Sequence, residues 1–430
     1  MVDEASFGLL GATLGHSYSP QIHEMLGSAP YRLIERPTPE DAQAFLRAGA
    51  FRGVNVTIPY KRVAYACCDE LSDAAARLRN VNTVVRRADG TLFGDNTDYH
   101  GFLSLLGATL GTRDLRGTTC LVLGDGGASL TIQAALADCG ARVLVASRHG
   151  ALTYPTLAAD EALRGQVGVI VNATPVGMFP HADDPLLVDP ADYPGLRGVV
   201  DIVYNPLRTR LVQRARELGL PARGGLRMLV SQAKLSSDAF LGERRPEELE
   251  GQTLSRLVRR LANVSLIGMP GSGKTTVGRR LAALLGRELV DVDELVARDA
   301  GRPIPEIFAA EGEDGFRRRE VACTARACAR PGRVIATGGG VVTRPENLGA
   351  LRANGLVALL KRGLADDGTE LDATGRPLSQ TAGVARLRAE RRDAYEAWAD
   401  ASFGGPGARE VAARIAAWFE RECDAACERW

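Results

Sequence analysis

The sequence predicts an α/β protein built from several successive domains. Three observations lead to this expectation. Short apolar runs of strand character alternate with helical stretches along most of the chain. Two of these runs, ending at Leu123 and Ile267, lead directly into glycine-rich turns that are followed by helices. The length of 430 residues exceeds what a single hydrophobic core usually supports.

Composition narrows the classes of function. The chain is 45% hydrophobic and 24% charged with a net charge of +1, so we expect no general attraction to nucleic acid or to an anionic membrane. No apolar run approaches the ~18 residues of a membrane span, and the first residues are acidic where a secretory signal is basic. The eight cysteines show no C-x-x-C or Cys/His spacing. We therefore expect a cytoplasmic protein with reduced thiols and small-molecule partners, of undetermined oligomeric state.

Residues 1–101 predict an α/β domain that carries clustered polar motifs. A strand over Phe7–Leu14, a polar turn and a helix over Gln21–Leu26 open it, and another strand lies near Gly53–Pro59. Four motifs follow these elements: Ser17-x-Ser19-Pro20, Asn55-Val56-Thr57-x-Pro59-x-Lys61, Val81-Asn82-Thr83 and Asp95-Asn96-Thr97-Asp98-x-x-Gly101. A lysine beside an aspartate can supply and recover a proton, as the reduction of a ketone requires.

Together, these four motifs resemble the substrate domain of shikimate dehydrogenases. The resemblance implies that Ser17 and Ser19 bind the carboxylate of a small ring acid, and that Lys61 and Asp98 are the catalytic pair and also touch the substrate. It further implies that three side chains bind the ring hydroxyls: Asn55, Thr57 and Asn82. A site that bonds each hydroxyl rejects analogues that lack one.

The middle of the chain predicts a dinucleotide-binding domain over residues 102–224. A strand (Thr119–Leu123), a glycine turn, a helix to about Asp138 and a strand (Arg142–Ala146) form the start of a βαβ unit. The turn supplies the candidate pyrophosphate-binding residues Gly124, Gly126, Gly127, Ala128 and Ser129.

The choice of dinucleotide is predicted at the end of the second strand of this unit. Arg148 stands where an acidic residue would select NAD, and it could pair with a 2′-phosphate, which favours NADP. Asp125 inside the turn and Leu130 after it depart from the family pattern and favour weaker NADP binding. The resemblance adds Asn172, Thr174 and Gly225 beside the cofactor, and Tyr204 and Gln232 beside the substrate.

The segment around Gln232 resembles the family's returning helix. Residues 225–245 are therefore expected to complete the substrate domain, so that the nucleotide domain, resembling a Rossmann fold, is an insertion. Residues 246–262 are expected to form a short connector helix with an apolar stripe of Leu249, Leu254, Leu257 and Leu261.

Residues 263–430 predict a P-loop domain with a parallel sheet. Gly268-Met269-Pro270-Gly271-Ser272-Gly273-Lys274-Thr275 fits G-x-x-x-x-G-K-[ST], between an apolar strand and an amphipathic helix. Glycines let backbone N–H groups face an anion at a helix N-terminus. Lys274 is expected at the β/γ-phosphates and Thr275 at Mg²⁺. The expected ATP-binding residues are Gly271, Ser272, Gly273, Lys274, Thr275, Thr276 and Arg376.

The later motifs of this domain are similar to those of shikimate kinases, which have a fold like that of nucleoside monophosphate kinases. The resemblance implies that Asp293 orients or deprotonates the acceptor hydroxyl, that Asp291 holds Mg²⁺ through water, and that Arg376 stabilises the transferred charge. It also implies a substrate pocket made of Asp293, Arg317, Gly338, Gly339, Gly340 and Arg391, with Phe308 and Phe316 as an apolar wall or as plain core.

The sequence thus predicts a bifunctional enzyme. Its first half would reduce 3-dehydroshikimate with NADPH, and its second half would phosphorylate shikimate with ATP and Mg²⁺. Two alternatives remain open. The C-terminal half could be a nucleotide-binding regulatory module without kinase activity, because Asp366, Asp367, Glu370 and Asp372 make its predicted lid acidic. The N-terminal half could be a quinate/shikimate dehydrogenase that uses NAD.

Overall fold

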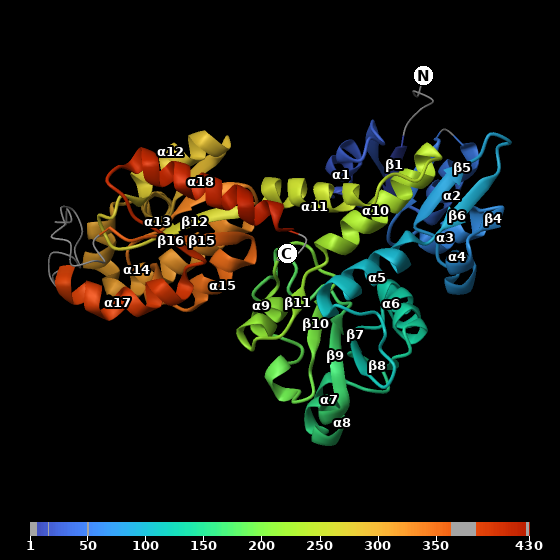
Figure 1. The fold of residues 1–430 in the computed structure, drawn as a ribbon, viewed down its shortest axis with the longest axis horizontal. Coiled ribbons are helices and arrows are strands. Elements are labelled where there is room, and N and C mark those ends of the chain that lie inside the picture. The colour runs from blue at the N-terminus through green and yellow to red at the C-terminus, as the bar shows by residue number, and fades with distance from the viewer. Residues whose placement is uncertain (1–6, 16, 50, 363–383, 427–429) are drawn as a thin grey trace. The chain divides into compact units, whose positions relative to one another are not determined.

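The computed structural model describes residues 7–15, 17–49, 51–362, 384–426 and 430, without the side chains of residues 384, 385 and 388. The chain divides into two units (Figure 1). Unit 1 comprises Met1–Tyr204, Arg214–Leu257 and Ala426–Trp430, and unit 2 comprises Asn205–Gln213 and Val258–Ala425. Among the described residues, no helix is both long enough and apolar enough to cross a membrane.

The first sheet of unit 1 is mixed and follows the order β2-β1-β3-β5-β6-β4. Strands β1, β2 and β3 are parallel, whereas β5 runs antiparallel to β3 and to β6. Its strands are β1 (Phe7–Gly11), β2 (Tyr31–Glu35), β3 (Gly53–Val56), β4 (Glu70–Leu71), β5 (Thr83–Arg86) and β6 (Leu92–Asp95). The accompanying helices are α1 (Ser19–Met25), α2 (Pro39–Ala48), α3 (Lys61–Cys67), α4 (Asp73–Leu78), α5 (Thr97–Leu110) and α10 (Leu226–Leu241).

Helices α5 and α10 pack side by side, although more than a hundred residues separate them (Figure 1). A Cβ at Gly101 of α5 would lie 2.8 Å from the carbonyl oxygen of Met228 and 3.1 Å from Cβ of Gln232, so the glycine permits this close approach. Helix α10 also contacts α1, β3 and β5. The predicted returning helix is therefore present, lies against the first sheet, and runs on to Leu241.

The second sheet of unit 1 is parallel and follows the order β11-β10-β9-β7-β8. Its strands are β7 (Thr119–Leu123), β8 (Arg142–Ala146), β9 (Val167–Asn172), β10 (Gly198–Asp201) and β11 (Ala222–Arg223). Both ranges predicted for β7 and β8 match. The associated helices are α6 (Gly127–Asp138), α7 (Tyr154–Ala159), α8 (Glu161–Gln166), α9 (Arg210–Glu217), which crosses the boundary between the units, and the 3-10 turn η1 (Pro190–Asp192). Phe102, Leu105 and Leu106 of α5 belong to the same core as β7 and β9.

Unit 2 is organised around a parallel sheet with the order β13-β14-β12-β15-β16. Its strands are β12 (Asn263–Ile267), β13 (Glu288–Asp291), β14 (Arg333–Ala336), β15 (Gly355–Leu360) and β16 (Ala401–Phe403). Its helices are α12 (Lys274–Leu285), α13 (Val292–Ala300), α14 (Ile304–Ala329), α15 (Glu346–Ala353), α17 (Val384–Trp398), α18 (Ala408–Asp424) and the 3-10 turn η2 (Val341–Thr343). Helix α11 (Glu248–Leu261) occupies the predicted connector and crosses the boundary between the units.

Strand β13 is shorter than the sequence predicts, and this places a candidate catalytic residue. The sequence Leu289-Val290-Asp291-Val292-Asp293 predicts a strand that ends in acidic residues at Asp293, but β13 ends at Asp291 and α13 begins at the next residue. The Asp291 carboxylate caps α13 by accepting hydrogen bonds from the backbone N–H groups of Asp293 and Glu294. Asp293 therefore lies in the first turn of a helix whose position is set by Asp291.

Candidate active sites

The first candidate site is centred on an ion pair between Lys61 and Asp98. Lys61 is the first residue of α3 and Asp98 lies in the first turn of α5, so two helix starts bring together residues that are 37 positions apart. Lys61 Nζ lies 2.5 Å from Asp98 Oδ2, and the two side chains are 19% and 18% exposed. Both groups are thus shielded from bulk water yet reachable, as a proton donor and its partner must be.

The predicted carboxylate-binding serines lie beside a pair of tyrosines. Ser17 is half-buried and Ser19 is buried at the start of α1, and the Ser19 N–H donates to Ser17 Oγ at 3.2 Å. Tyr18 stands between them, with its ring 5.8 Å from that of Tyr204. Burial is the main cause that raises the pKa of Tyr18 to about 12, and the nearby Tyr204 is the second cause. Burial also raises the pKa of Tyr204, so both phenols stay neutral donors at neutral pH. The turn and the predicted substrate residue Tyr204 are therefore neighbours.

The Asn55 side chain, which the sequence predicts at a ring hydroxyl, is hydrogen-bonded to other side chains inside the protein. It is 5% exposed on β3, and its Oδ1 accepts a hydrogen bond from the Tyr31 hydroxyl. Its Nδ2 lies within hydrogen-bond distance of the Asn82 carbonyl oxygen, Thr83 Oγ1 and Ser236 Oγ. An amide has two hydrogens, and these interior partners use both. The amide hydrogens of Asn55 thus have interior partners, and its contact with the substrate stays a prediction.

Asn82, in contrast to Asn55, has an amide hydrogen that its interior bonds do not use. Its Oδ1 accepts from the Thr97 N–H at 2.8 Å, and its Nδ2 donates one hydrogen to Thr97 Oγ1 at 3.0 Å. One amide hydrogen is not used by these bonds. Thr57, after β3, is half-buried, and so is Gln232 on α10, whose Nε2 donates to the Leu229 carbonyl oxygen. These three side chains remain candidates for the ring hydroxyls.

The glycine turn after β7 fits a dinucleotide. Gly124 has a φ of +97°, and a Cβ there would lie 2.7 Å from Thr174 Cγ2, so the turn and the predicted loop after β9 meet. Ser129 Oγ closes the turn by donating to the Gly124 carbonyl oxygen at 2.6 Å. A Cβ at Gly126 or Gly127 would meet nothing within 4 Å. The N-terminus of α6 therefore presents open backbone N–H groups, as pyrophosphate binding requires.

Hydrogen bonds made by Asn172 and Gly225 hold the loops that flank this turn. Asn172 Oδ1 accepts from Thr174, and Asn172 Nδ2 donates to Asp201 Oδ1 at 3.0 Å. Gly225 donates its N–H to the Val203 carbonyl oxygen, and a Cβ at Gly225 would collide with the backbone of Ile202. Asn172 and Gly225 thus shape the crevice at the carboxyl ends of the strands, the position where open α/β sheets bind ligands.

Arg148 is exposed after β8, close to Asp125 and Tyr154. The pKa of Tyr154 is raised, first by burial and then by the negative charge of Asp125, while the positive charge of Arg148 opposes this. Both residues that bear on cofactor choice therefore act on the same phenol. Leu130 on α6 is 57% exposed, a large apolar surface next to the turn.

The second candidate site is the phosphate loop of unit 2. Gly268, Gly271 and Gly273 all have positive φ, and the 7% exposed Lys274 donates from Nζ to the carbonyl oxygens of Gly268 and Met269 at 2.8 and 2.9 Å. The Lys274 side chain is thus held across the opening of the phosphate loop, and the backbone N–H groups of the loop line that opening. Ser272 Oγ is buried without a hydrogen-bond partner among the described residues, and Thr276 is exposed on α12.

Thr275 and Asp291 form the predicted magnesium corner. The Thr275 hydroxyl donates to Asp291 Oδ2 at 2.7 Å. A hydroxyl and a carboxylate oxygen are hard ligands that suit Mg²⁺ together with waters and substrate phosphates. The described residues hold no cluster of three or more His, Cys, Asp and Glu side chains suited to a metal, as is usual where phosphates complete the coordination.

The predicted acceptor pocket gathers around three glycines after β14. A Cβ at Gly338 would lie 2.7 Å from Asp293 Oδ1 and 2.5 Å from Glu320 Oε1, and one at Gly339 would lie 2.5 Å from the ring of Pro270. A Cβ at Gly340 would overlap the guanidinium of Arg317. The glycine run therefore lets the Asp293 carboxylate, the phosphate loop and an arginine converge on one place.

Two arginines in this pocket are oriented by the protein. Arg317 is buried on α14, with Nη1 2.7 Å from Oε2 of the fully buried Glu320, and it also contacts Glu313. Burial alone would lower the pKa of Arg317, but the charges of Glu320 and Glu313 raise it. Arg391 on α17 donates from Nη1 to the Gly339 carbonyl oxygen at 2.9 Å. Both guanidiniums are therefore held as charged forks suited to a carboxylate.

Glu320 is not among the site residues that the sequence predicts, yet it pairs with Arg317 and lies against Gly338. Its spacing of three residues from Arg317, which puts both on one face of a helix, was the available signal. Phe308 and Phe316 stack with their centroids 4.7 Å apart, beside this pair. Arg376 and the acidic lid residues lie outside the described residues.

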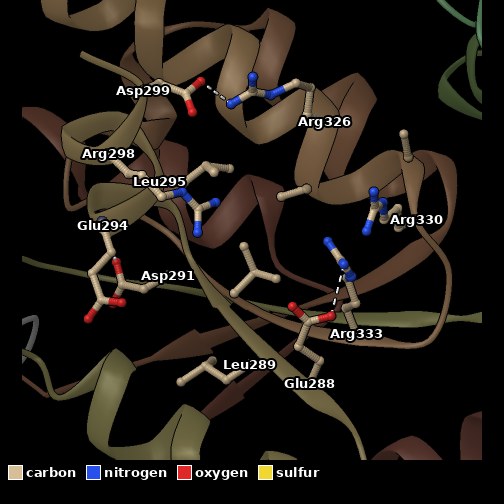
Figure 2. Close-up of a pocket in the computed structure, with 13 residues that line it drawn as sticks. Glu288, Leu289, Asp291, Glu294, Leu295, Arg298, Asp299, Arg326, Arg330 and Arg333 are labelled. Carbon is tan, nitrogen blue, oxygen red and sulfur yellow. Dashed lines mark hydrogen bonds and ion pairs between the residues drawn. The ribbon is translucent and has the colours of Figure 1, made fainter. Parts of the chain in front are cut away.

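A cavity of about 710 Å³ in unit 2 is lined by residues of β13, α13, the C-terminal half of α14 and the start of β14 (Figure 2). Figure 2 shows two ion pairs in its wall, Arg326 with Asp299 and Arg333 with Glu288. Asp291 is the one predicted site residue among those that line it. The cavity therefore shares Asp291 with the predicted magnesium site, and no residue of the predicted acceptor pocket is among the described residues that line it.

The folds and these two constellations define an enzyme with a dinucleotide-dependent oxidoreductase followed by a P-loop phosphotransferase. The family model "Shikimate dehydrogenase substrate binding domain" matches residues 9–84, and the model "Shikimate kinase" matches residues 270–420. The shikimate dehydrogenase (NADP(+)) of Methylobacterium radiotolerans is 39% identical over 262 residues, which cover 55% of this chain and 91% of that protein. This chain belongs to the shikimate dehydrogenase family, and its residues 270–420 match the shikimate kinase model.

Two further relatives bear on the two halves separately. The shikimate kinase of Symbiobacterium thermophilum is 60% identical over 98 residues, which cover 23% of this chain and 56% of that kinase. The crystal structure of shikimate 5-dehydrogenase from Thermus thermophilus in complex with NADP(H) and shikimate matches with a TM-score of 0.50 and 34% identity, covering 59% of this chain and 99% of that one. The resemblances predicted from both sets of motifs are thereby confirmed, as is the α/β fold class.

Proposed function

We propose that this chain catalyses two consecutive steps, the NADPH-dependent reduction of 3-dehydroshikimate to shikimate and the ATP-dependent phosphorylation of the shikimate 3-hydroxyl. The observation that carries the proposal is the presence in one chain of two formed catalytic constellations. One is the Lys61–Asp98 pair, and the other is the convergence of Asp293 and Arg317 on the glycines after β14.

In the dehydrogenase, NADPH supplies the hydride when it is bound. Lys61 Nζ gives a proton to the carbonyl oxygen that becomes the new hydroxyl, and Asp98, 2.5 Å away, keeps the ammonium in place and assists its reprotonation. Ser17 and Ser19 hold the substrate carboxylate. Thr57, Asn82, Tyr204 and Gln232 orient the ring, while the open N-terminus of α6 and Arg148 bind the cofactor phosphates.

In the kinase domain, ATP would supply the phosphoryl group, and Thr275 and Asp291 would hold Mg²⁺, whose charge would offset that of the phosphates. Asp293 accepts the proton of the 3-hydroxyl. Arg317 and Arg391 bind the shikimate carboxylate, and Lys274 leaves the loop carbonyl groups to contact the β/γ-phosphates. Arg376 is assigned to the transferred charge from its motif alone.

A coupled assay tests the proposal directly. The whole chain is given 3-dehydroshikimate, NADPH, ATP and Mg²⁺, and shikimate 3-phosphate is measured. Lys274→Met should abolish its formation while NADPH oxidation continues at the wild-type rate, and Lys61→Met should block NADPH oxidation but leave the phosphorylation of added shikimate intact. If the wild type phosphorylates no shikimate, the C-terminal half is a nucleotide-binding module. A preference for NADH over NADPH would overturn the assignment of Arg148.

A further inference from the structure

A buried set of polar side chains includes Thr97, the residue that precedes Asp98 of the Lys61–Asp98 pair. It consists of Asn55, Asn82, Thr83, Thr97 and Ser236, which we call the polar hub. Each of the five is at most 5% exposed. They come from β3, from β5 and the residue before it, from the start of α5 and from α10. Polar groups in such a place must find their partners inside the protein.

Ser236 of α10 is the member that joins the hub to the returning helix. Its Oγ lies 2.8 Å from Asn55 Nδ2, 2.8 Å from Thr83 Oγ1 and 3.1 Å from Thr97 Oγ1. It also lies 2.9 Å from the carbonyl oxygen of Gln232, one turn earlier on the same helix. A single hydroxyl therefore ties α10 to β3, β5 and α5.

The hub continues from Ser236 to the catalytic pair in two short steps. Thr97 precedes Asp98 in the chain, and its N–H donates to Asn82 Oδ1 at 2.8 Å while its Oγ1 accepts from Asn82 Nδ2 at 3.0 Å. The first turn of α5, which carries Asp98, is thereby fixed to Asn82. Because Thr97 Oγ1 also meets Ser236, the orientation of both Asn82 and Asp98 depends on this serine.

We infer that Ser236 is a positioning residue of the dehydrogenase: it holds Asp98, Asn82 and Gln232 in the arrangement that the reduction needs. This rests on the proposed dehydrogenase function. Removing the hydroxyl takes away the acceptor of Asn55 Nδ2 and a hydrogen-bond partner of the Thr83 and Thr97 hydroxyls, so these groups must rotate to new partners. Small displacements of a catalytic pair are expensive in rate, on the order of 10²-fold per ångström.

Ser237 offers a matched control on the same helix. Both serines are fully buried, but Ser237 faces α1: its Oγ lies 2.7 Å from Ser28 Oγ and accepts from Arg245 Nη2 at 2.6 Å. Ser236→Ala and Ser237→Ala remove the same atom from the same helix and leave a similar number of hydrogen bonds broken. Only Ser236 is bonded to the residues that place Asp98.

The test compares both variants with the wild type as whole chains. We measure kcat and KM for 3-dehydroshikimate and NADPH, the pH profile of kcat, the thermal midpoint, and the rate of shikimate phosphorylation by the same chain. Ser236→Ala should lower dehydrogenase kcat about tenfold and displace its pH profile, with an unchanged KM for NADPH. Ser237→Ala should lower the thermal midpoint as much as Ser236→Ala does, but it should leave the kcat and the pH profile of the dehydrogenase unchanged.

Equal kinetic effects of the two variants, or an unchanged kcat in Ser236→Ala, would overturn the inference, because the hydroxyl would then serve stability alone. If Ser236→Ala does not fold, Ser236→Cys is measured by the same criteria, since a thiol keeps the size and weakens the hydrogen bonds. A wild type that does not reduce 3-dehydroshikimate at all would instead refute the proposed function, and the two failures are therefore distinguishable.

Discussion

Replacing Gly338 with alanine adds one methyl group at the centre of the kinase pocket. The backbone of Gly338 does not require a positive φ, so the effect comes from space alone. The new Cβ would lie 2.7 Å from Asp293 Oδ1 and 2.5 Å from Glu320 Oε1, whereas ordinary contacts begin at 3.4 Å. Asp293 must therefore move by about 0.7 Å and Glu320 by about 0.9 Å, or the backbone at Gly338 must withdraw.

Glu320 is the less able of the two to move, because it is fully buried and bonded to Arg317 at 2.7 Å. The backbone at Gly338 must therefore shift away from Glu320, and Asp293, the proposed base, is displaced from the geometry it has beside the glycine. A misplacement approaching 1 Å costs on the order of 10²-fold in rate, so we expect the shikimate-dependent kcat to fall tenfold to a hundredfold, about 1.4 to 2.7 kcal/mol. Overpacking should also cost about 1–3 kcal/mol of stability.

The assay is shikimate-dependent ADP formation, with thermal unfolding measured alongside and dehydrogenase rate as the internal standard. Gly349→Ala is the matched control, because a Cβ at Gly349 on α15 meets nothing within 4 Å. This control should retain full kinase activity and gain a little stability, since alanine favours a helix interior by up to about 1 kcal/mol. A Gly338→Ala protein with a kcat within twofold of wild type would refute the proposed place of Asp293.

Three further outcomes are expected. Asp98→Asn removes the charged partner of Lys61 and should lower dehydrogenase kcat by about 10² to 10⁴, measured as NADPH oxidation, with shikimate phosphorylation as the control; less than a threefold loss would contradict the pair's role. Arg148→Gln should raise KM for NADPH at least tenfold, about 1.5 kcal/mol or more, and leave KM for NADH nearly unchanged; equal changes would show that Arg148 does not contact the 2′-phosphate. Burial lowers the pKa of His23 from 6.5 to about 3, so the unfolded chain binds a proton that the folded chain excludes. His23 therefore lowers the free energy of unfolding by about 1.4 kcal/mol per pH unit as pH falls from about 6.5 toward 3. In urea unfolding between pH 4 and 6, His23→Gln should lose this pH dependence, and an unchanged dependence would refute the effect of His23.

Much of the fold was predictable because its signals are local. Strand β7, the turn at Gly124 and the start of α6 follow one another in the chain, and so do β12, the phosphate loop and α12. The boundary between β13 and α13 shows the limit of such local patterns. The capping of α13 by Asp291 ended β13 two residues early, because acidic residues after a strand serve equally well as a strand end and as a helix cap.

The candidate sites were predicted less completely, because a residue type does not show which of its hydrogen bonds are already used. Asn55 and Asn82 occupy similar motifs, yet the structure uses the whole amide of Asn55 internally and leaves Asn82 a hydrogen to spare. The partner that decides this, Ser236, is 181 residues away from Asn55. Glu320 likewise gained a role only when α14 placed it against Gly338.

By itself, the sequence determined which chemistries this chain contains: a lysine and an aspartate in two short motifs, a dinucleotide turn, and a phosphate loop whose backbone conformation glycines make possible. Only the tertiary structure decided which side chains meet, as when two helix starts bring Lys61 and Asp98 within 2.5 Å and three glycines let Asp293, Glu320 and Arg317 converge. The physical reason is that turn conformation and helix capping depend on neighbours in the chain. The satisfaction of buried polar groups and the pairing of charges depend instead on distances between segments, which packing alone sets.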